Sequence, residues 1–430
     1  MDSPAVTRAV CYDAEVECMP PPRLAALREA LLARAVTRAR RAPFFRERLA
    51  GFGEVGDRLP LARFQEGVPL TGKQELRAAG ARAWAEGDAP ALLLATSGTT
   101  GSRITLPYSG GDLRRWHALV ARTLWTNGVR ADDAVLLPVP LGVFTGGQGM
   151  FGGLRQLGCR LIPLGATTTP ALADALRGAF GVAPTAIVGL PSHMLRLLET
   201  LPTAGVDPAG SPLRIGSFGA EAWTEAARAR IEAGFGLVAM DSYGIGEICG
   251  PGIAAECAAR DGLHLWEDAF LAEIVDRTSG EPVPDGAPGE LVLTPLFREV
   301  LPLLRYRTGD EAAMIPEPCR CGRTHRRLTR IARRLDDVLV ITGVNIEPAD
   351  IERLLYGIPW VGNEFYLEAS GENRDTLGIH LEASERAPAP PDAEAQISEA
   401  VRRDYHVRVA VAVHPFGSLD RAPGKARRIR

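Results

Sequence analysis

Short apolar runs alternate with amphipathic segments through the middle of the chain. Each run is followed by apolar positions at helical spacing, which predicts strands and helices in turn. The alternation indicates an α/β domain with a parallel sheet. The predicted strands are residues 91–95 (a buried strand), 134–139, 159–163, 186–190, 214–218 and 237–242, and the predicted helices are residues 112–127, 150–157, 170–180, a helix from residue 191, and 225–233.

The pattern changes at both ends of the chain. Helical spacing within residues 22–50 predicts an N-terminal surface helix that ends near Pro43. Residues 271–275 and 290–294 flank a turn-rich segment and predict antiparallel strands. We therefore expect a large α/β domain of mixed or parallel sheets over residues 1–334 and a smaller α+β domain over 335–430. The smaller domain is predicted to have strands at 338–341, 364–369, 376–382 and 407–413 and helices at 348–355 and 393–405.

Glycine-rich and polar segments follow several predicted strands. Residues 146–149, 219–221 and 243–247 lie at predicted carboxyl ends of strands, where open parallel sheets bind ligands. A further loop, Thr96-Ser97-Gly98-Thr99-Thr100-Gly101-Ser102, follows residues 91–95. Its glycines let backbone N–H groups approach an anion, and its hydroxyls add neutral donors. This favours phosphate binding, with a simple hairpin turn as the alternative. The loop is not the P-loop of NTPases, because the required lysine is absent.

Composition narrows the class of protein. A chain of 430 residues is too long for one ordinary core, so two or more domains are expected. The net charge of −3 gives no general attraction to nucleic acid or to an anionic membrane. No signal pattern and no apolar run of membrane-spanning length is visible. We expect a cytoplasmic protein that binds neither nucleic acid nor membranes.

Lysine is nearly absent. Only two of the 49 basic residues are lysine, at Lys73 and Lys425. Arginine cannot replace lysine where a compact point charge is required, so each lysine is a functional candidate. We interpret Lys73 as a chance survivor of the drift toward arginine.

Cysteine and histidine gather in two parts of the chain. Cys257 precedes His264 by seven positions, and Cys319 and Cys321 form a C-x-C pair. Thiolate and imidazole ligands suit a closed tetrahedral Zn²⁺ site, which would attach the connection before the small domain to the large domain. Buried free thiols are the alternative, and Cys249 and His325 are spare candidate ligands. The odd total of seven cysteines argues against a disulfide framework.

Several motifs, taken in order, resemble the adenylate-forming acyl- and aryl-CoA synthetase superfamily, and within it the phenylacetate–CoA ligases. Beside the Thr96–Ser102 loop they are Phe144-Thr145-Gly146-Gly147, Phe218-Gly219-Ala220-Glu221, Tyr243-Gly244-Ile245-Gly246-Glu247, Gly262-Leu263-His264-Leu265-Trp266-Glu267-Asp268, Tyr306-Arg307-Thr308-Gly309-Asp310, Cys319-Arg320-Cys321-Gly322-Arg323-Thr324-His325, Arg334-Leu335-Asp336-Asp337, Gly343-Val344-Asn345-Ile346-Glu347-Pro348 and Pro423-Gly424-Lys425.

The resemblance implies roles for these residues. Residues Thr96, Ser97, Gly98, Thr99, Thr100 and Gly101 would hold the β- and γ-phosphates of ATP, and Gly219, Ala220, Glu221, Ser242, Tyr243 and Gly244 would surround the adenine end of the site. Asp310 and Arg334 would reach the ribose, and Glu247 would hold Mg²⁺. Lys425 would stabilise the charge that develops as the acid attacks the α-phosphate. The small domain would then swing about Asp336, so that a thiol approaches past Gly343.

The resemblance also implies an aromatic carboxylic acid as substrate. The expected walls of its pocket are Phe144, Gly147, Gln148, His193, Phe218 and Tyr243, and Gln148 or His193 would bind a ring amino or hydroxyl group. Coenzyme A is the expected thiol. A carrier-protein phosphopantetheine is the alternative, and a non-catalytic adenylate-binding protein is a distant one. Whether the protein forms a homodimer is left open. We expect the enzyme to act in secondary metabolism.

Two segments depart from the family pattern. Ser102 and then Arg103 stand where the phosphate loop usually has Lys and Pro, and Arg333 stands where a glycine usually precedes the ribose-contacting arginine. The first departure either weakens pyrophosphate binding or transfers the role of the lysine to Arg103. The second puts the geometry near the hinge in doubt.

Overall fold

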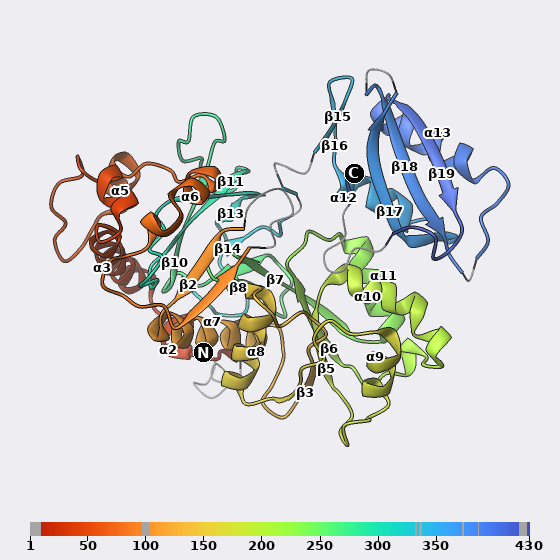
Figure 1. Cartoon of the computed structure of the whole chain (residues 1–430), viewed down its shortest axis with the longest axis horizontal. Helices are drawn as coiled ribbons and strands as arrows, with labels where there is room; N and C mark the ends of the chain where they lie inside the picture. Colours follow the sequence, from red (N-terminus) through yellow and green to blue (C-terminus); the bar gives the residue numbers. More distant parts are fainter. Residues whose placement is uncertain are drawn as a thin grey trace.

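The computed structural model describes residues 10–96, 103–331, 333–334, 338–371, 374–385, 387–420 and 428–430. Figure 1 shows a large body built around a central sheet and a smaller C-terminal lobe that stands beside it. Among the helices in these ranges, none combines the length and the apolar character needed to cross a membrane.

The predicted N-terminal helix that ends near Pro43 corresponds to α3. Helix α3 covers Pro21–Ala39, and a separate helix α4 covers Pro43–Arg48. Pro43 explains the break, because the residue before a proline avoids helical backbone. The face of α3 with Leu24, Leu32 and Val36 is buried. The neighbouring short helices are α2 (Ala14–Glu17), α5 (Leu61–Gly67), α6 (Lys73–Ala79) and the 3-10 helix η1 (Gly80–Ala83).

The largest sheet has nine strands, in the order β13-β14-β9-β8-β7-β6-β5-β3-β4. Strands β4, β3, β5, β6 and β7 run parallel, which confirms the prediction for this region. Strands β8, β9, β14 and β13 continue the sheet in antiparallel pairs. The strands are β3 (Ala134–Leu136), β4 (Arg160–Ile162), β5 (Ala186–Gly189), β6 (Ile215–Gly219), β7 (Val238–Ile245), β8 (Gly250–Glu256), β9 (Leu263–Leu265), β13 (Met314–Ile315) and β14 (Arg327–Leu328).

Successive side chains of these strands enter two hydrophobic cores. Val135 and Val188 belong to a core shared with α7 and α8, whereas Leu136 and Ile187 belong to one shared with α9, α10 and α11. Since neighbouring residues of a strand point to opposite faces, helices cover both faces of the sheet. The helices are α7 (Gly110–Thr126), α8 (Thr145–Leu157), α9 (Thr169–Leu176), α10 (Pro191–Thr200) and α11 (Glu225–Phe235), with 3-10 helices η2 (Pro202–Ala204) and η3 (Pro208–Gly210).

The strand predicted at residues 91–95 exists but is not buried. It forms β1 (Leu92–Ala95) in a two-stranded antiparallel sheet with β2 (Thr105–Tyr108). Leu93 is 51% exposed. The apolar run therefore belongs to a surface hairpin (orange in Figure 1), whose strands precede and follow residues 97–102 in the sequence.

The glycine-rich segment predicted at a strand end lies instead inside α8, which begins at Thr145. Helix α8 packs along α7. A Cβ at Gly149 would overlap Trp116, and a Cβ at Gly152 would overlap His117. These glycines therefore allow the two helices to approach closely.

Strand β7 extends beyond its predicted end at residue 242. It reaches Ile245, because Gly244 pairs with Pro251 and Ile245 pairs with Gly250 of the antiparallel strand β8. The first three residues of the Tyr243–Glu247 motif are thus held in a sheet ladder, and Glu247 lies in the turn that follows, two residues after the strand ends.

A second sheet contains β10 (Phe270–Val275), β11 (Gly289–Pro295) and β12 (Tyr306–Ala312). Its antiparallel pairing confirms the prediction for this region. Thr71 pairs with Tyr306 outside the sheet. The Thr71 amide donates to the Arg305 carbonyl at 2.8 Å, and the Arg307 amide donates to the Thr71 carbonyl at 2.9 Å. These bonds fix the start of α6 beside β12.

The C-terminal part has the α+β character that the sequence predicts. A mixed three-stranded sheet of β17 (Val361–Ser370), β18 (Thr376–Ala383) and β19 (Arg408–His414) accompanies α12 (Pro348–Tyr356) and α13 (Ala393–Tyr405). The hairpin β15 (Leu339–Ile341) and β16 (Val344–Ile346) precedes them. Helix α12 contacts α11 and β17 contacts α10, so the lobe rests on these two helices (Figure 1).

Candidate active site

Tyr243 and Asp310 join the two sheets at the predicted ribose-binding position. The Tyr243 hydroxyl donates to Asp310 Oδ2 at 2.6 Å, from β7 to β12. Arg334 Nε lies 3.4 Å from Asp310 Oδ1. Burial and the Asp310 carboxylate raise the pKa of Tyr243 well above its ordinary value, so the phenol keeps its proton. Three residues predicted to contact the nucleotide thus form one hydrogen-bonded group.

Glu247 has a partner that the sequence interpretation dismissed. Its carboxylate Oε1 lies 3.1 Å from Lys73 Nζ, and the Glu247 side chain is only 5% exposed. Burial and the Glu247 carboxylate also raise the pKa of Tyr306 well above its ordinary value. The interpretation of Lys73 as a chance survivor therefore overlooked a specific ion pair. The near absence of lysine was the sequence signal that could have identified it.

The predicted adenine-binding residues follow β6. A Cβ at Gly219 would overlap the Ser242 carbonyl of β7, so only glycine allows the two strands this close. Ala220 adopts φ +70°, which is unusual for a residue with a side chain. Glu221 Oε1 accepts a hydrogen bond from the Ser192 amide at 2.6 Å, at the start of α10. The turn is thereby held between β6, β7 and α10.

The predicted acid-binding segment adjoins this group through α8. A Cβ at Gly246 would lie 3.4 Å from Thr145 Oγ1, which brings the start of α8 next to the Tyr243–Glu247 motif. Phe144 precedes α8, and the Arg103 guanidinium lies 5.9 Å from the centre of its ring.

Three predicted pocket residues have structural contacts instead. The Gln148 amide donates to the Leu141 carbonyl and, at 3.2 Å, to the Gly142 carbonyl. A Cβ at Gly147 would overlap the Pro140 carbonyl. Phe218 is fully buried and packs edge-to-face on Trp223. These contacts support the loop before α8 and the core below β6, so we do not retain Gly147, Gln148 and Phe218 as pocket walls.

His193 lies on the first turn of α10. Burial and the nearby Arg196 lower the pKa of His193 to about 4, so the ring is neutral near pH 7. A neutral imidazole offers one donor and one acceptor. His193 therefore keeps the hydrogen-bonding capacity that the prediction assigned to it.

Several predicted residues lie elsewhere. The Thr96 hydroxyl accepts from the Ile104 amide at 3.1 Å, which closes the base of the hairpin loop. Gly343 has φ +82° at the exposed turn of the β15–β16 hairpin, and a Cβ there would meet nothing within 4 Å. Ser97, Gly98, Thr99, Thr100, Gly101, Asp336 and Lys425 lie outside the described residues.

The predicted metal ligands meet at one edge of the large sheet. Potential ligand atoms of Cys257, His264, Cys319 and Cys321 all lie within 4.8 Å of one another. Cys257 Sγ is 3.7 Å from Cys319 Sγ, and Cys321 Sγ is 3.2 Å from His264 Nε2. His264 Nδ1 lies 3.1 Å from the His325 carbonyl, which orients Nε2 toward the sulfurs.

The cysteine loop also contacts the N-terminal segment. Arg323 Nε lies 2.6 Å from Glu17 Oε2, and both side chains are buried. Arg323 Nη1 lies 3.6 Å from Cys321 Sγ. One side chain therefore links α2 to the cysteine cluster.

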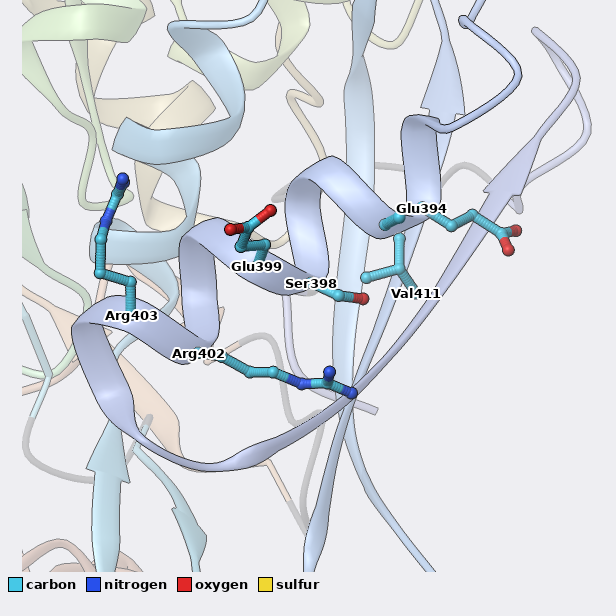
Figure 2. Close-up of a pocket in the computed structure, with 7 residues that line it drawn as sticks. Glu394, Ser398, Glu399, Arg402, Arg403 and Val411 are labelled. Atoms are coloured by element: carbon cyan, nitrogen blue, oxygen red, sulfur yellow. The ribbon is translucent and has the colours of Figure 1, made fainter.

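A shallow groove on the C-terminal lobe lies apart from these residues. Figure 2 shows it between α13 and β19, and its lining includes Glu394, Ser398, Glu399, Arg402, Arg403 and Val411. None of the residues predicted to bind ATP or the acid lines it. We therefore locate the candidate active site at the Tyr243, Glu247 and Asp310 group.

Comparison with known proteins gives consistent matches over the whole chain. Residues 26–294 match the AMP-binding enzymes, and residues 343–430 match the AMP-binding enzyme C-terminal domain. Phenylacetate–coenzyme A ligase of Pseudomonas putida is 36% identical over 395 residues, which cover 89% of this chain and 88% of that protein.

Solved structures of 2-hydroxyisobutyryl-CoA ligase match the fold. The post-adenylation state has a TM-score of 0.89 at 25% identity, covering 100% of this chain and 94% of that one. The thioesterification state has a TM-score of 0.72 at 26% identity, covering 100% and 93%. The present arrangement of the two lobes is thus more similar to the post-adenylation state than to the thioesterification state of that ligase.

These matches support a catalytic protein. The enzyme uses ATP to activate a small carboxylic acid, releases AMP, and uses coenzyme A as the thiol. The chain belongs to the AMP-binding enzyme family and, within it, to the AMP-forming acid–coenzyme A ligases that resemble phenylacetate–coenzyme A ligase.

Proposed function

We propose that this ligase activates an aromatic or arylacetic acid and transfers it to coenzyme A. The observation that carries the proposal is the similarity, over 89% of the chain, to an enzyme named for phenylacetate. Two features of the site support it. Phe144 precedes α8 beside the Tyr243–Glu247 motif, and His193 offers a neutral imidazole.

The nucleotide would extend from the Gly219–Glu221 turn to Asp310. Asp310 is 4% exposed and already accepts from Tyr243. A buried carboxylate that is held by a tyrosine and an arginine is oriented to accept hydrogen bonds from ribose hydroxyls, and such charge-assisted bonds are strong. We assign Asp310 and Arg334 to the ribose and Tyr243 to the junction of adenine and acid.

Glu247 fits a Mg²⁺ ion that is shared with ATP. It supplies a buried carboxylate oxygen beside the site, and Mg²⁺ commonly binds to one or two carboxylates together with substrate phosphates. When bound, the ion would neutralise charge on the phosphate oxygens. Glu247 would hold it next to the segment that carries Tyr243.

The first half-reaction joins the acid to AMP. An oxygen of the substrate carboxylate attacks the α-phosphorus, the bond to the bridging oxygen breaks, and pyrophosphate leaves with that electron pair. We assign Lys425 to the charge that develops on the phosphoryl oxygens. In the second half-reaction the thiol sulfur attacks the acyl carbon, loses its proton, and AMP leaves. Between these steps the small domain would rotate about Asp336. This rotation would move Lys425 away from the site and bring the hairpin that contains Gly343 toward it.

The cysteine cluster fits a structural Zn²⁺ ion. Four thiol and imidazole ligands can satisfy a closed tetrahedral site, and the ring orientation of His264 is fixed by the His325 carbonyl. We propose that the metal ties the C-x-C loop to β8 and β9.

The test is acid-dependent formation of AMP with a panel of aryl, arylacetic, short hydroxy and fatty acids, with and without coenzyme A. We expect an aryl or arylacetic acid to give the highest kcat/KM and the corresponding thioester. A preference for fatty or short hydroxy acids would refute the proposed acid class. If the adenylate forms, coenzyme A is not acylated and a phosphopantetheinylated carrier protein is loaded instead, then the carrier protein rather than coenzyme A is the acceptor.

A further inference from the structure

Lys73 is the only lysine in the described part of the chain, and it faces the candidate active site. Its Nζ lies 3.1 Å from Glu247 Oε1, the carboxylate proposed to hold Mg²⁺. The Lys73 side chain is 45% exposed and that of Glu247 is 5% exposed. A cation on a long, half-exposed side chain is therefore held against a buried carboxylate.

The fold brings this lysine to the site from 174 positions away in the sequence. Thr71 lies beside β12 through hydrogen bonds with Arg305 and Arg307. The Gly72 amide then donates to Glu75 Oε2 at 2.7 Å, which fixes the start of α6. Lys73 is the next residue, so its backbone is attached to the sheet that carries Asp310.

Lys73 can supply a positive charge that the predicted phosphate loop does not carry in its sequence. The loop Thr96–Ser102, which would hold the β- and γ-phosphates, consists of glycine and hydroxyl residues and contains no lysine or arginine. The nearby Arg103 guanidinium has a contact of its own, 5.9 Å from the centre of the Phe144 ring. ATP carries several negative charges, and a lysine ammonium is a compact point charge for phosphate.

We propose that Lys73 binds the phosphate groups of ATP and replaces the missing lysine of the phosphate loop. In the absence of nucleotide it pairs with Glu247. With ATP bound, Lys73 would turn from Glu247 to the phosphate oxygens, and Glu247 would be free to hold Mg²⁺, so the buried carboxylate would stay compensated. The Lys73 ammonium would neutralise charge on the phosphates while the α-phosphorus is attacked.

The inference rests on the proposed function, and the experiment separates the two. We compare wild type with Lys73→Met, Lys73→Arg and the control Arg82→Met. Arg82 pairs with Glu47 on the surface, 2.6 Å apart, so its loss removes the same charge without touching the site. The equilibrium dissociation constants for ATP and for AMP are measured in the absence of acid, when no turnover occurs. Both half-reactions are then measured separately.

We expect Lys73→Met to weaken ATP binding by about 10- to 100-fold, the size of a lost hydrogen bond to a charged group. ATP–pyrophosphate exchange should fall at least as much, whereas thioester formation from supplied acyl-adenylate should stay near the wild-type rate. Lys73→Arg should recover part of the ATP affinity because it keeps the charge. Weakened binding of ATP alone assigns the lysine to the β- and γ-phosphates, and weakened binding of AMP as well assigns it to the α-phosphate.

The proposal is wrong if Lys73→Met binds ATP as wild type and Arg82→Met do. It is also wrong if both half-reactions fall together while ATP affinity is unchanged, because that result indicates a structural role. Absence of exchange in the wild type with every acid tested would instead count against the proposed function.

Discussion

The Thr224 hydroxyl donates to Glu352 Oε1 at 2.9 Å and thereby joins the large domain to the C-terminal lobe. Thr224 caps α11, and Glu352 lies on α12 with 8% exposure. Glu352 Oε2 is also 3.6 Å from Arg428 Nη2, close to the end of the chain. Arg230 Nη1 adds a second link to Asn363 Oδ1 at 2.9 Å. The lobe is thus attached by polar contacts that a rotation would have to break.

Loss of the Thr224–Glu352 contact should affect the two half-reactions differently. These contacts belong to an arrangement close to the post-adenylation state, so Glu352→Ala, which removes the acceptor, should slow ATP–pyrophosphate exchange. We expect a fall of about 5- to 20-fold, which is the range of a modest coupling between two states. Thioester formation from supplied acyl-adenylate should be unchanged or faster.

A matched control lies on the same helix. Asp350 contacts Arg353 and Tyr405, which both belong to the C-terminal lobe. Asp350→Ala removes one carboxylate from α12, and its described partners belong to the same lobe, so it should leave the ratio of the two half-reaction rates unchanged. If the ratio of the two half-reaction rates is the same in both variants, the Thr224–Glu352 bond does not stabilise this arrangement of the domains.

Asp310 should determine recognition of the ribose. Asp310→Ala should raise the KM for ATP by roughly 30- to 200-fold, because hydrogen bonds to a buried charged acceptor are lost. Wild type should discriminate against 2′-deoxy-ATP, and the variant should use both nucleotides equally poorly. Steady-state kinetics with the two nucleotides tests this directly. If the variant still prefers ATP over 2′-deoxy-ATP as wild type does, Asp310 does not bind the ribose hydroxyls.

The cysteine cluster should contain zinc. Elemental analysis of the purified protein should find about one Zn²⁺ per chain, since a closed four-ligand site binds the metal tightly. Cys321→Ser should lower the zinc content and reduce Tm by about 5 °C or more, because the metal contributes to folding. Cys159→Ser is the control, since Cys159 contacts the Arg130 carbonyl outside the cluster. Protein that is free of metal but fully stable would favour buried free thiols.

His193 should make the protein less stable in mild acid. Its pKa is lowered by burial from 6.5 to about 4, so between these values the unfolded chain binds a proton that the native state does not. The free energy of unfolding therefore falls as the pH drops from 6.5 toward 4, by up to about 3 kcal/mol from this residue.

Denaturant unfolding at pH 7.5 and pH 5 measures this effect. His193→Asn should lose less stability between the two pH values than wild type does. His406→Asn is the control, because His406 is exposed and its left-handed backbone, with φ +56°, suits asparagine. Identical pH dependence in wild type and His193→Asn would contradict the lowered pKa.

The sequence by itself determined the order and type of most elements. The predicted helix at residues 393–405 has the same bounds in the structure, and the predicted strands at 186–190 and 376–382 are close to β5 and β18. These segments have clear local periodicity, which depends only on neighbouring residues. The cysteine and histidine ligands were also identifiable, because their residue types carry the signal.

The tertiary structure alone decided which residues meet. The ladder with β8 extends β7 to Ile245, and close packing on Trp116 makes a helix of the glycine-rich segment at Thr145–Leu157. Phe218 and Gln148 have chemically suitable side chains, but the core and the loop before α8 use them for packing. The ion pair of Lys73 with Glu247 joins residues that no local pattern connects. Such contacts depend on how distant strands and helices pack, and local periodicity carries no information about them.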